Sequence, residues 1–241
     1  MKFKLEVIGF NIESCIAAQN AGAHRIELCD NPADGGTTPS YGFIKAASQY
    51  LHIDLFPIIR PRGGDFLYSD EEFEIMKADI EVCKQLGCEG VVFGMLNVDG
   101  TVDKKRCTIL ADIAYPLGIT FHRAFDRTAD PFKAMEDIID IGCERILTSG
   151  QQSNAVDGAA MIAQLIEQAD HRISIMPGSG VRSENIIILA EKTKAFEFHT
   201  SARIAVESKM NYSQVSLNEN LQSVAVDAVE VKKIAGLLAS I

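Results

Sequence analysis

The sequence predicts a single α/β domain in which eight parallel strands close into a TIM (β/α)8 barrel. Strand-like and helix-like stretches alternate along the chain without interruption, which is typical of βαβ units. The strand-like stretches number eight, as many as close such a barrel. The chain is 241 residues long, and one barrel of this kind takes roughly 250 residues. We therefore expect residues 1–241 to form one domain.

Each expected strand is a short run rich in apolar and β-branched residues. Gly22, Gly87, Gly118 and Gly142 stand where the preceding helix should end before the next strand begins. In chain order the strands are expected at residues 3–8, 25–28, 54–59, 90–93, 119–122, 145–148, 172–176 and 195–198.

Helix starts are expected in the gaps between these strands. Ser69 with Glu72 forms a capping box, Asp130 precedes a proline as an N-cap should, and Ser183 stands before a glutamate. Residues 203–226 are polar and aperiodic, so no regular element is expected there, and residues 227–240 have a helical pattern. A long connection that leaves the last strand is usually functional or mobile. Residues 203–226 are therefore a candidate lid.

Charge and composition exclude several classes of partner. The chain carries 33 acidic and 23 basic residues, a net charge of −10, which repels a nucleic-acid backbone. No run approaches the ~20 apolar residues of a membrane span, and the first residues do not resemble a signal peptide. We expect a cytoplasmic protein that binds neither nucleic acid nor membrane. The oligomeric state stays open, a homo-oligomer included.

Alternation along the strands places charged side chains inside the barrel. In residues 25–29, Ile26 and Leu28 can face the helices, which turns Arg25, Glu27 and Cys29 inward. TIM-barrel interiors are normally apolar, and active sites lie at the carboxyl ends of the strands. The charges could form an internal ion-pair network, but their position favours a functional site. The same parity turns Glu6, Glu197 and His199 inward, and Arg60 follows the third strand.

The stretch ITFHRAFD, residues 119–126, ends a strand in His122, Arg123 and Asp126. A histidine can donate and accept protons near neutral pH, so His122 is a candidate general acid or base, although it could be a buried core residue. Asp126 could instead cap the next helix. Glu6, Glu27, Asp126 and Glu197 are the carboxylates that we expect to take part in catalysis.

Arginines and glycine-rich turns predict an anion site at the same end of the barrel. The turn PRGGDF, residues 61–66, lies beside Arg60 and contains Arg62, and PGSGV follows the seventh strand. Turns after the last two strands often hold phosphate in this fold. The expected anion-binding residues are Arg60, Arg62, Arg123, Ser149, Gly178, Gly180, His199 and Ser201.

The segments RPRGGDFLYS, TFHRAFD and LTSG occur together in this chain. In this combination the sequence resembles the CutC family, the so-called copper homeostasis proteins, from Phe3 to about residue 202. The resemblance implies a TIM barrel and a cytoplasmic protein that binds and handles Cu(I). Family members carry a second cysteine two residues after the first-strand glutamate, where this chain has Ile8.

Cu(I) prefers soft sulfur ligands. Six cysteines occur without a C-x-x-C pair, and of these Cys29 is at a strand end on the polar side. Cys29 is therefore the candidate metal ligand, and we expect it to be accessible from the barrel mouth. Two functions remain. The resemblance implies Cu(I) binding, whereas the residues at the mouth favour a metal-independent enzyme for a small anionic or phosphorylated substrate. Apart from Cu(I), no cofactor is expected.

Overall fold

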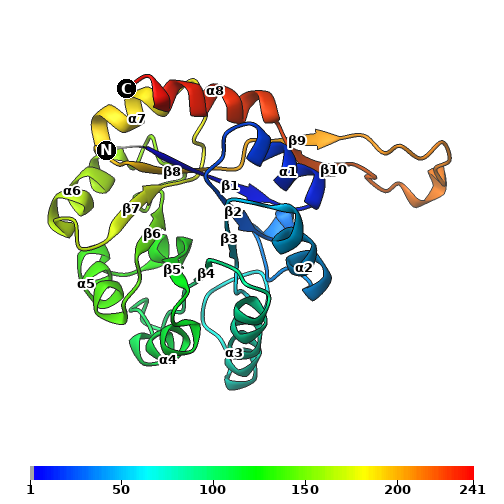
Figure 1. Ribbon diagram of the computed structural model, residues 1–241. Helices are drawn as coiled ribbons and strands as arrows, with labels where there is room; N and C mark the ends of the chain where they lie inside the picture. Colours follow the sequence, from blue (N-terminus) through cyan, green and yellow to red (C-terminus); the bar gives the residue numbers. More distant parts are fainter. Residues whose placement is uncertain (1–2) are drawn as a thin grey trace.

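The computed structural model describes residues 3–241 and confirms the TIM barrel. The parallel strands form a ring, and the helices cover its outside (Figure 1). Most strands begin or end within two residues of the predicted positions. They are β1 Lys4–Gly9, β2 Arg25–Leu28, β3 Asp54–Pro57, β4 Gly90–Phe93, β5 Gly118–Phe121, β6 Arg145–Thr148, β7 Ser174–Pro177 and β8 Glu197–Thr200.

Two four-stranded sheets make up the wall of the barrel. One has the order β3-β2-β1-β8 and the other the order β4-β5-β6-β7. A parallel bridge between Ile58 and Val92 joins them on one side, and β7 lies beside β8 on the other. The register pairs Glu6 with both Arg25 and His199, which brings three polar side chains to one level of the interior.

The helices begin at side chains that satisfy their first backbone N–H groups. Ser69 and Glu72 form the predicted capping box, and Asp130 accepts from Phe132 and Lys133. Helix α7 begins later than predicted, because Ser183 bonds to Glu230 instead of capping it. The helices are α1 Ile12–Asn20, α2 Tyr41–Tyr50, α3 Asp70–Gln85, α4 Lys104–Ala114, α5 Pro131–Ile141, α6 Ala159–Ala169, α7 Ile186–Thr193 and α8 Ala228–Ala239, with 3-10 turns η1 Pro32–Asp34, η2 Arg123–Arg127 and η3 Val215–Leu217.

The main apolar core lies between the strands and the helices. Ile26 and Leu28 are fully buried in it, so the predicted alternation of β2 is confirmed. A smaller apolar cluster occupies part of the barrel interior and contains Ile8, Cys29 and Phe56. Among residues 3–241, none of the helices combines the length and apolar character that crossing a bilayer requires.

Residues 203–226 contain a β-hairpin, so the expectation of an irregular segment is wrong. Strands β9 Arg203–Val206 and β10 Ser223–Val226 pair in antiparallel register, and Figure 1 shows this arm projecting sideways from the barrel. Its two strands are only four residues long, too short for a clear alternating pattern. Exposed apolar side chains along the arm include Met210, Tyr212 and Val215.

Candidate functional site

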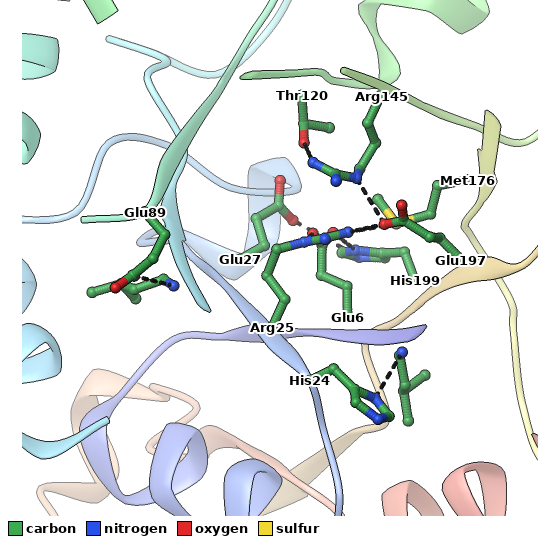
Figure 2. A network of polar contacts seen from close by, with 12 residues as sticks. Glu6, His24, Arg25, Glu27, Glu89, Thr120, Arg145, Met176, Glu197 and His199 are labelled. Carbon is green, nitrogen blue, oxygen red and sulfur yellow. Dashed lines mark hydrogen bonds and ion pairs between the residues drawn. The ribbon is translucent and has the colours of Figure 1, made fainter. Parts of the chain in front are cut away.

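A layer of paired charges crosses the barrel interior below the mouth. Arg25 on β2 donates from Nη2 to Oε2 of Glu197 at 2.6 Å, and Arg145 on β6 donates from Nε to the same oxygen at 2.8 Å. Nε of Arg25 also donates to Glu6. Figure 2 shows these side chains converging from four strands. Both guanidinium groups stack on the ring of Phe56.

The carboxylates of this layer stay ionised. Burial raises the pKa of Glu6, but the charge of Arg25 and the hydrogen bond with His199 lower it more, to about 2. For Glu197 burial is likewise outweighed by Arg145 and Arg25, so its pKa is lowered. Paired buried charges of this kind order the interior. Glu6 and Glu197, expected as catalytic carboxylates, are thus held in ion pairs inside the barrel.

Glu27 lies one level nearer the mouth and behaves differently. Burial, aided by the charge of Glu6, raises the pKa of Glu27 to about 7, against the opposing effects of His199 and Arg25. Nε2 of His199 is 3.8 Å from a Glu27 oxygen, and its Nδ1 is 2.7 Å from Glu6 (Figure 2). Burial lowers the pKa of His199, but the hydrogen bond to Glu6 and the nearby carboxylates raise it overall. Glu27 can therefore exchange a proton near neutral pH.

A cavity of about 190 Å³ opens at the carboxyl ends of the strands, where this fold keeps its active sites. Its wall combines titratable groups with cations. The charged and titratable lining residues are Glu27, Arg60, His122, Arg123, His199 and Arg203. A wall of this composition can hold an anion and move a proton beside it.

His122 presents one free ring nitrogen in this cavity. The backbone N–H of Ala124 donates to Nδ1 at 3.2 Å, and Nε2 is buried without a hydrogen-bond partner among residues 3–241. Burial and the charge of Arg60 lower its pKa to about 3. The partner of the His122 ring is thus a backbone N–H and not a carboxylate. His122 is therefore neutral near pH 7, and its Nε2 can donate a hydrogen bond into the cavity.

Arg60 holds two loops at the edge of the cavity. Its Nη1 donates to the carbonyl oxygens of Asp34 and Gly36, both at 2.7 Å, and Nη2 donates to that of Gly64 at 2.9 Å. Only Nε lacks a partner among the described residues. Arg62 pairs with Glu72 at 2.6 Å and does not line the cavity. The structure thus leaves the Nε–H of Arg60 without a partner and directs Arg62 elsewhere.

Asp126 accepts hydrogen bonds that position the β6 end. Its carboxylate accepts from Thr148, Gln151 and both the backbone N–H and hydroxyl of Ser149. Nε of Arg123 donates to Asp126 at 2.8 Å and Nη2 to Ser149 at 2.8 Å. Arg123 lines the cavity, while Asp126 and Ser149 orient it. These contacts engage both carboxylate oxygens of Asp126 at the end of β6.

The turns after β7 and β8 complete the wall. Gly180 and Ser201 line the cavity as expected. Gly178 leaves room for neighbours instead, since a Cβ there would lie 2.4 Å from Leu147 and 3.3 Å from His199. Sequence reasoning missed Arg203, which donates to the carbonyl of Pro32 across the mouth. Its position just after the last strand, at the catalytic end of the barrel, is the sequence signal that could have identified it.

Cys29 is fully buried, so its expected accessibility from the mouth is wrong. The turn after β2 covers it, because a Cβ on Gly36 would lie 3.0 Å from the Cys29 sulfur. Burial and the charge of Glu27 raise its pKa, so the thiol stays protonated. All six cysteines are free and buried.

The donor set at the mouth does not fit Cu(I) well. Glu6, Glu27 and His199 could place one ligand atom each within 4.8 Å of one another. Two carboxylates and one imidazole suit a harder ion than Cu(I), which prefers sulfur. Ile8, where the family carries a second cysteine, supplies no ligand.

Comparisons with known proteins agree with the fold and the motifs. The sequence profile of the CutC family matches residues 3–204. A CutC family protein of Chromobacterium violaceum is 54% identical over 86% of this chain and 84% of its own length. The human "copper homeostasis protein cutC homolog" is 48% identical over 89% of this chain and 79% of its own length.

A solved structure supports the same assignment. The crystal structure of a CutC protein from Streptococcus agalactiae superposes with a TM-score of 0.79 at 36% identity. The superposition covers 83% of this chain and 98% of the Streptococcus agalactiae chain. Because the family profile matches most of the chain and a family member is 54% identical to it, the chain belongs to the CutC family.

Proposed function

We propose that the protein binds a small anionic or phosphorylated molecule at the barrel mouth and acts on it by proton transfer from its own side chains. The observation that carries this proposal is the composition of one cavity. Three arginines line it together with Glu27, whose pKa is about 7, and with the unpartnered Nε2 of His122.

The arginines differ in what they offer an anion. Arg60 is occupied by three carbonyl contacts, whereas Arg123 and Arg203 reach the cavity from the β5 and β8 ends. Arg203, Ser201 and Gly180 lie where TIM barrels often bind phosphate. Arginine remains charged at all physiological pH values and matches the geometry of an oxyanion. These residues support an anion seat on the β7–β8 side.

Titration calorimetry with inorganic phosphate and with glycerol 3-phosphate tests the anion seat. Losing a charge-assisted contact should raise Kd about tenfold or more in Arg203→Met. The matched control is Arg172→Met, which removes a surface arginine paired with Glu136 and should leave Kd unchanged. Absence of binding to the wild type, or equal weakening by both substitutions, contradicts the proposal.

Copper homeostasis is the second candidate function, and the family favours it. The human and mouse relatives carry that name. The thiolate, not the thiol, is the form of cysteine that binds a metal. Burial and the charge of Glu27 raise the pKa of Cys29, so Cu(I) would have to displace the thiol proton. Competition for Cu(I) with a chromogenic chelator tests this. Stoichiometric binding that is lost in Cys29→Ala supports a copper role, and binding retained in that variant contradicts this site.

We also propose a cytoplasmic location and a lid role for residues 203–226. Six free thiols suit a reducing compartment. Arg203, at the root of the arm, lines the cavity and bonds across the mouth to Pro32. Motion of the arm would therefore be transmitted to the cavity wall.

A further inference from the structure

Building on the anion site above, we propose that the substrate is a small carbonyl compound that carries the anionic group. The reaction begins with removal of a proton from the carbon next to the carbonyl. Glu27 accepts this proton, and the Nε2–H of His122 donates a hydrogen bond to the carbonyl oxygen. The inference rests on the proposed function and names its substrate class.

The tautomer of His122 follows from its contacts. Because the N–H of Ala124 donates to Nδ1, Nδ1 carries no hydrogen, and the hydrogen of the neutral ring is on Nε2. That Nε2–H is buried in a residue only 3% exposed and has no acceptor within residues 3–241. Buried donors are normally paired. A ligand oxygen in the cavity that His122 lines would supply the missing acceptor.

The surroundings keep this donor neutral and fixed. The ring of Phe66 lies 4.8 Å from that of His122 and also packs under Arg60. Gly94 leaves room on another side, since a Cβ there would lie 2.8 Å from the imidazole. The charge of Arg60 disfavours a second proton on the ring. Of the other charged and titratable groups that line the cavity, Arg123 and Arg203 are also cations, whereas Glu27 and His199 lie on the β2 and β8 side. A neutral, preorganised donor stabilises charge that develops on an oxygen.

The proposed step balances without a further reactant. The Glu27 carboxylate takes the proton, the C–H electron pair forms the C=C bond, and the carbonyl π electrons move onto oxygen. The resulting enolate oxygen accepts from His122. Return of the proton from Glu27 to the first carbon restores the substrate and gives exchange with solvent. Where that carbon carries a hydroxyl group, the hydroxyl proton moves to the enolate oxygen and the Glu27 proton to the former carbonyl carbon, which gives the isomeric carbonyl compound.

Two binding probes test the inference. Phosphoglycolohydroxamate resembles a phosphorylated enediolate, whereas glycerol 3-phosphate carries the same phosphate without a carbonyl. We expect the hydroxamate to bind the wild type at least about tenfold more tightly. His122→Asn keeps an oxygen that can accept from Ala124 but lacks Nε2. It should lose the hydroxamate preference while retaining its affinity for glycerol 3-phosphate.

The outcomes separate the two proposals. If neither probe binds, both the anion site and the inference fail. If glycerol 3-phosphate binds and the hydroxamate has no advantage, or keeps its advantage in His122→Asn, only the carbonyl inference fails. Nitrogen-15 NMR gives an independent readout. His122 should show the Nε2–H tautomer without titrating between about pH 5 and about 8, and a titrating or Nδ1-protonated ring overturns the inference.

Discussion

Two buried glutamates in neighbouring strands have pKa values shifted in opposite directions. Glu6 and Glu27 are 1% and 3% exposed, so burial disfavours the charge of both. Glu6 has Arg25 and His199 within hydrogen-bond distance, whereas Glu27 is 3.8 Å from His199. Their pKa values are accordingly about 2 and about 7. The distance to a counter-charge decides which carboxylate can exchange protons.

The raised pKa of Glu27 predicts a stability that falls with pH. A carboxyl group with a folded-state pKa of about 7 instead of 4.5 stabilises the fold below pH 4.5 and loses that contribution as pH rises through about 7. We expect the stability of the wild type to fall by about 3 kcal/mol from acid to mildly alkaline pH and Glu27→Gln to lack this decrease, as measured by urea unfolding. Glu27 also helps to raise the pKa of His199, so the substitution reduces the decrease that His199 contributes as well. Glu74→Gln is the exposed control, and parallel profiles for wild type and Glu27→Gln would contradict this.

Gly94 predicts a second effect at the residue scale. An added methyl group would lie 2.8 Å from His122 and 3.0 Å from Phe121, so Gly94→Ala should cost about 1–3 kcal/mol and weaken phosphate binding. Gly42 in α2 has open space around it, and Gly42→Ala should stabilise by about 0.5–1 kcal/mol. Urea unfolding and phosphate titration measure both effects. Equal behaviour of the two variants would show that Gly94 does not position His122.

The sequence predicted which side chains face the barrel interior but not which partners they take. Arg25 and Glu27 follow from the two-residue period of a strand, which is a local property. The pairing of Arg25 with Glu197 joins residues 172 positions apart and depends on how the barrel closes. For the same reason Cys29 was expected to be accessible from the barrel mouth, since the turn at Gly36 that covers it has no local signal.

At the scale of elements, local signals succeeded where they are strong. The capping box at Ser69 and the N-cap at Asp130 could be predicted because each spans only four residues. The hairpin of the arm could not be predicted, because an isolated two-stranded hairpin is marginally stable and its sequence pattern is weak. The base of the arm is fixed to the barrel. The backbone N–H of Val226 donates to the Ser14 hydroxyl, and that of Asp227 donates to the carbonyl oxygen of Ala202.

Shortening the arm separates its role from that of the barrel. A variant in which Asn-Gly replaces residues 207–222 should keep β9 and β10 paired through a two-residue turn. Because most side chains beyond the base are exposed, we expect its Tm to change by less than about 2 °C. As a lid, the arm should slow ligand release, so glycerol 3-phosphate should dissociate faster from this variant in stopped-flow measurements. Unchanged release would contradict the lid.

At the scale of the whole molecule, charges connect strands that belong to different sheets. Arg25 on β2 and Arg145 on β6 share one carboxylate of Glu197 on β8, and Arg25 also reaches the sulfur of Met176 on β7. The two four-stranded sheets are thereby linked through the interior on the side where β7 and β8 meet.

Removing the central cation should therefore destabilise the entire barrel. Arg25→Met removes a positive charge that pairs with the buried carboxylates of Glu6 and Glu197. We expect the free energy of unfolding to fall by about 3–5 kcal/mol at pH 7. Arg172→Met breaks a surface pair and should cost at most about 1 kcal/mol. In the wild type, the contribution of Glu6 is present above pH 4.5 and is lost as pH falls through about 2. Urea unfolding measures these differences, and equal losses in the two variants would show that the layer is not stabilising.

The same layer of charges also discriminates against incorrect assembly of the barrel. A slip of β1 by one residue against β2 would turn Glu6 toward the apolar helices and leave Arg25 facing an aliphatic side chain. Such a misaligned chain would bury isolated charges, so it is disfavoured relative to the native alignment even where its hydrophobic contacts are comparable. The ionic layer is therefore expected to disfavour misaligned barrels, and a fully apolar replacement is expected to lose that discrimination.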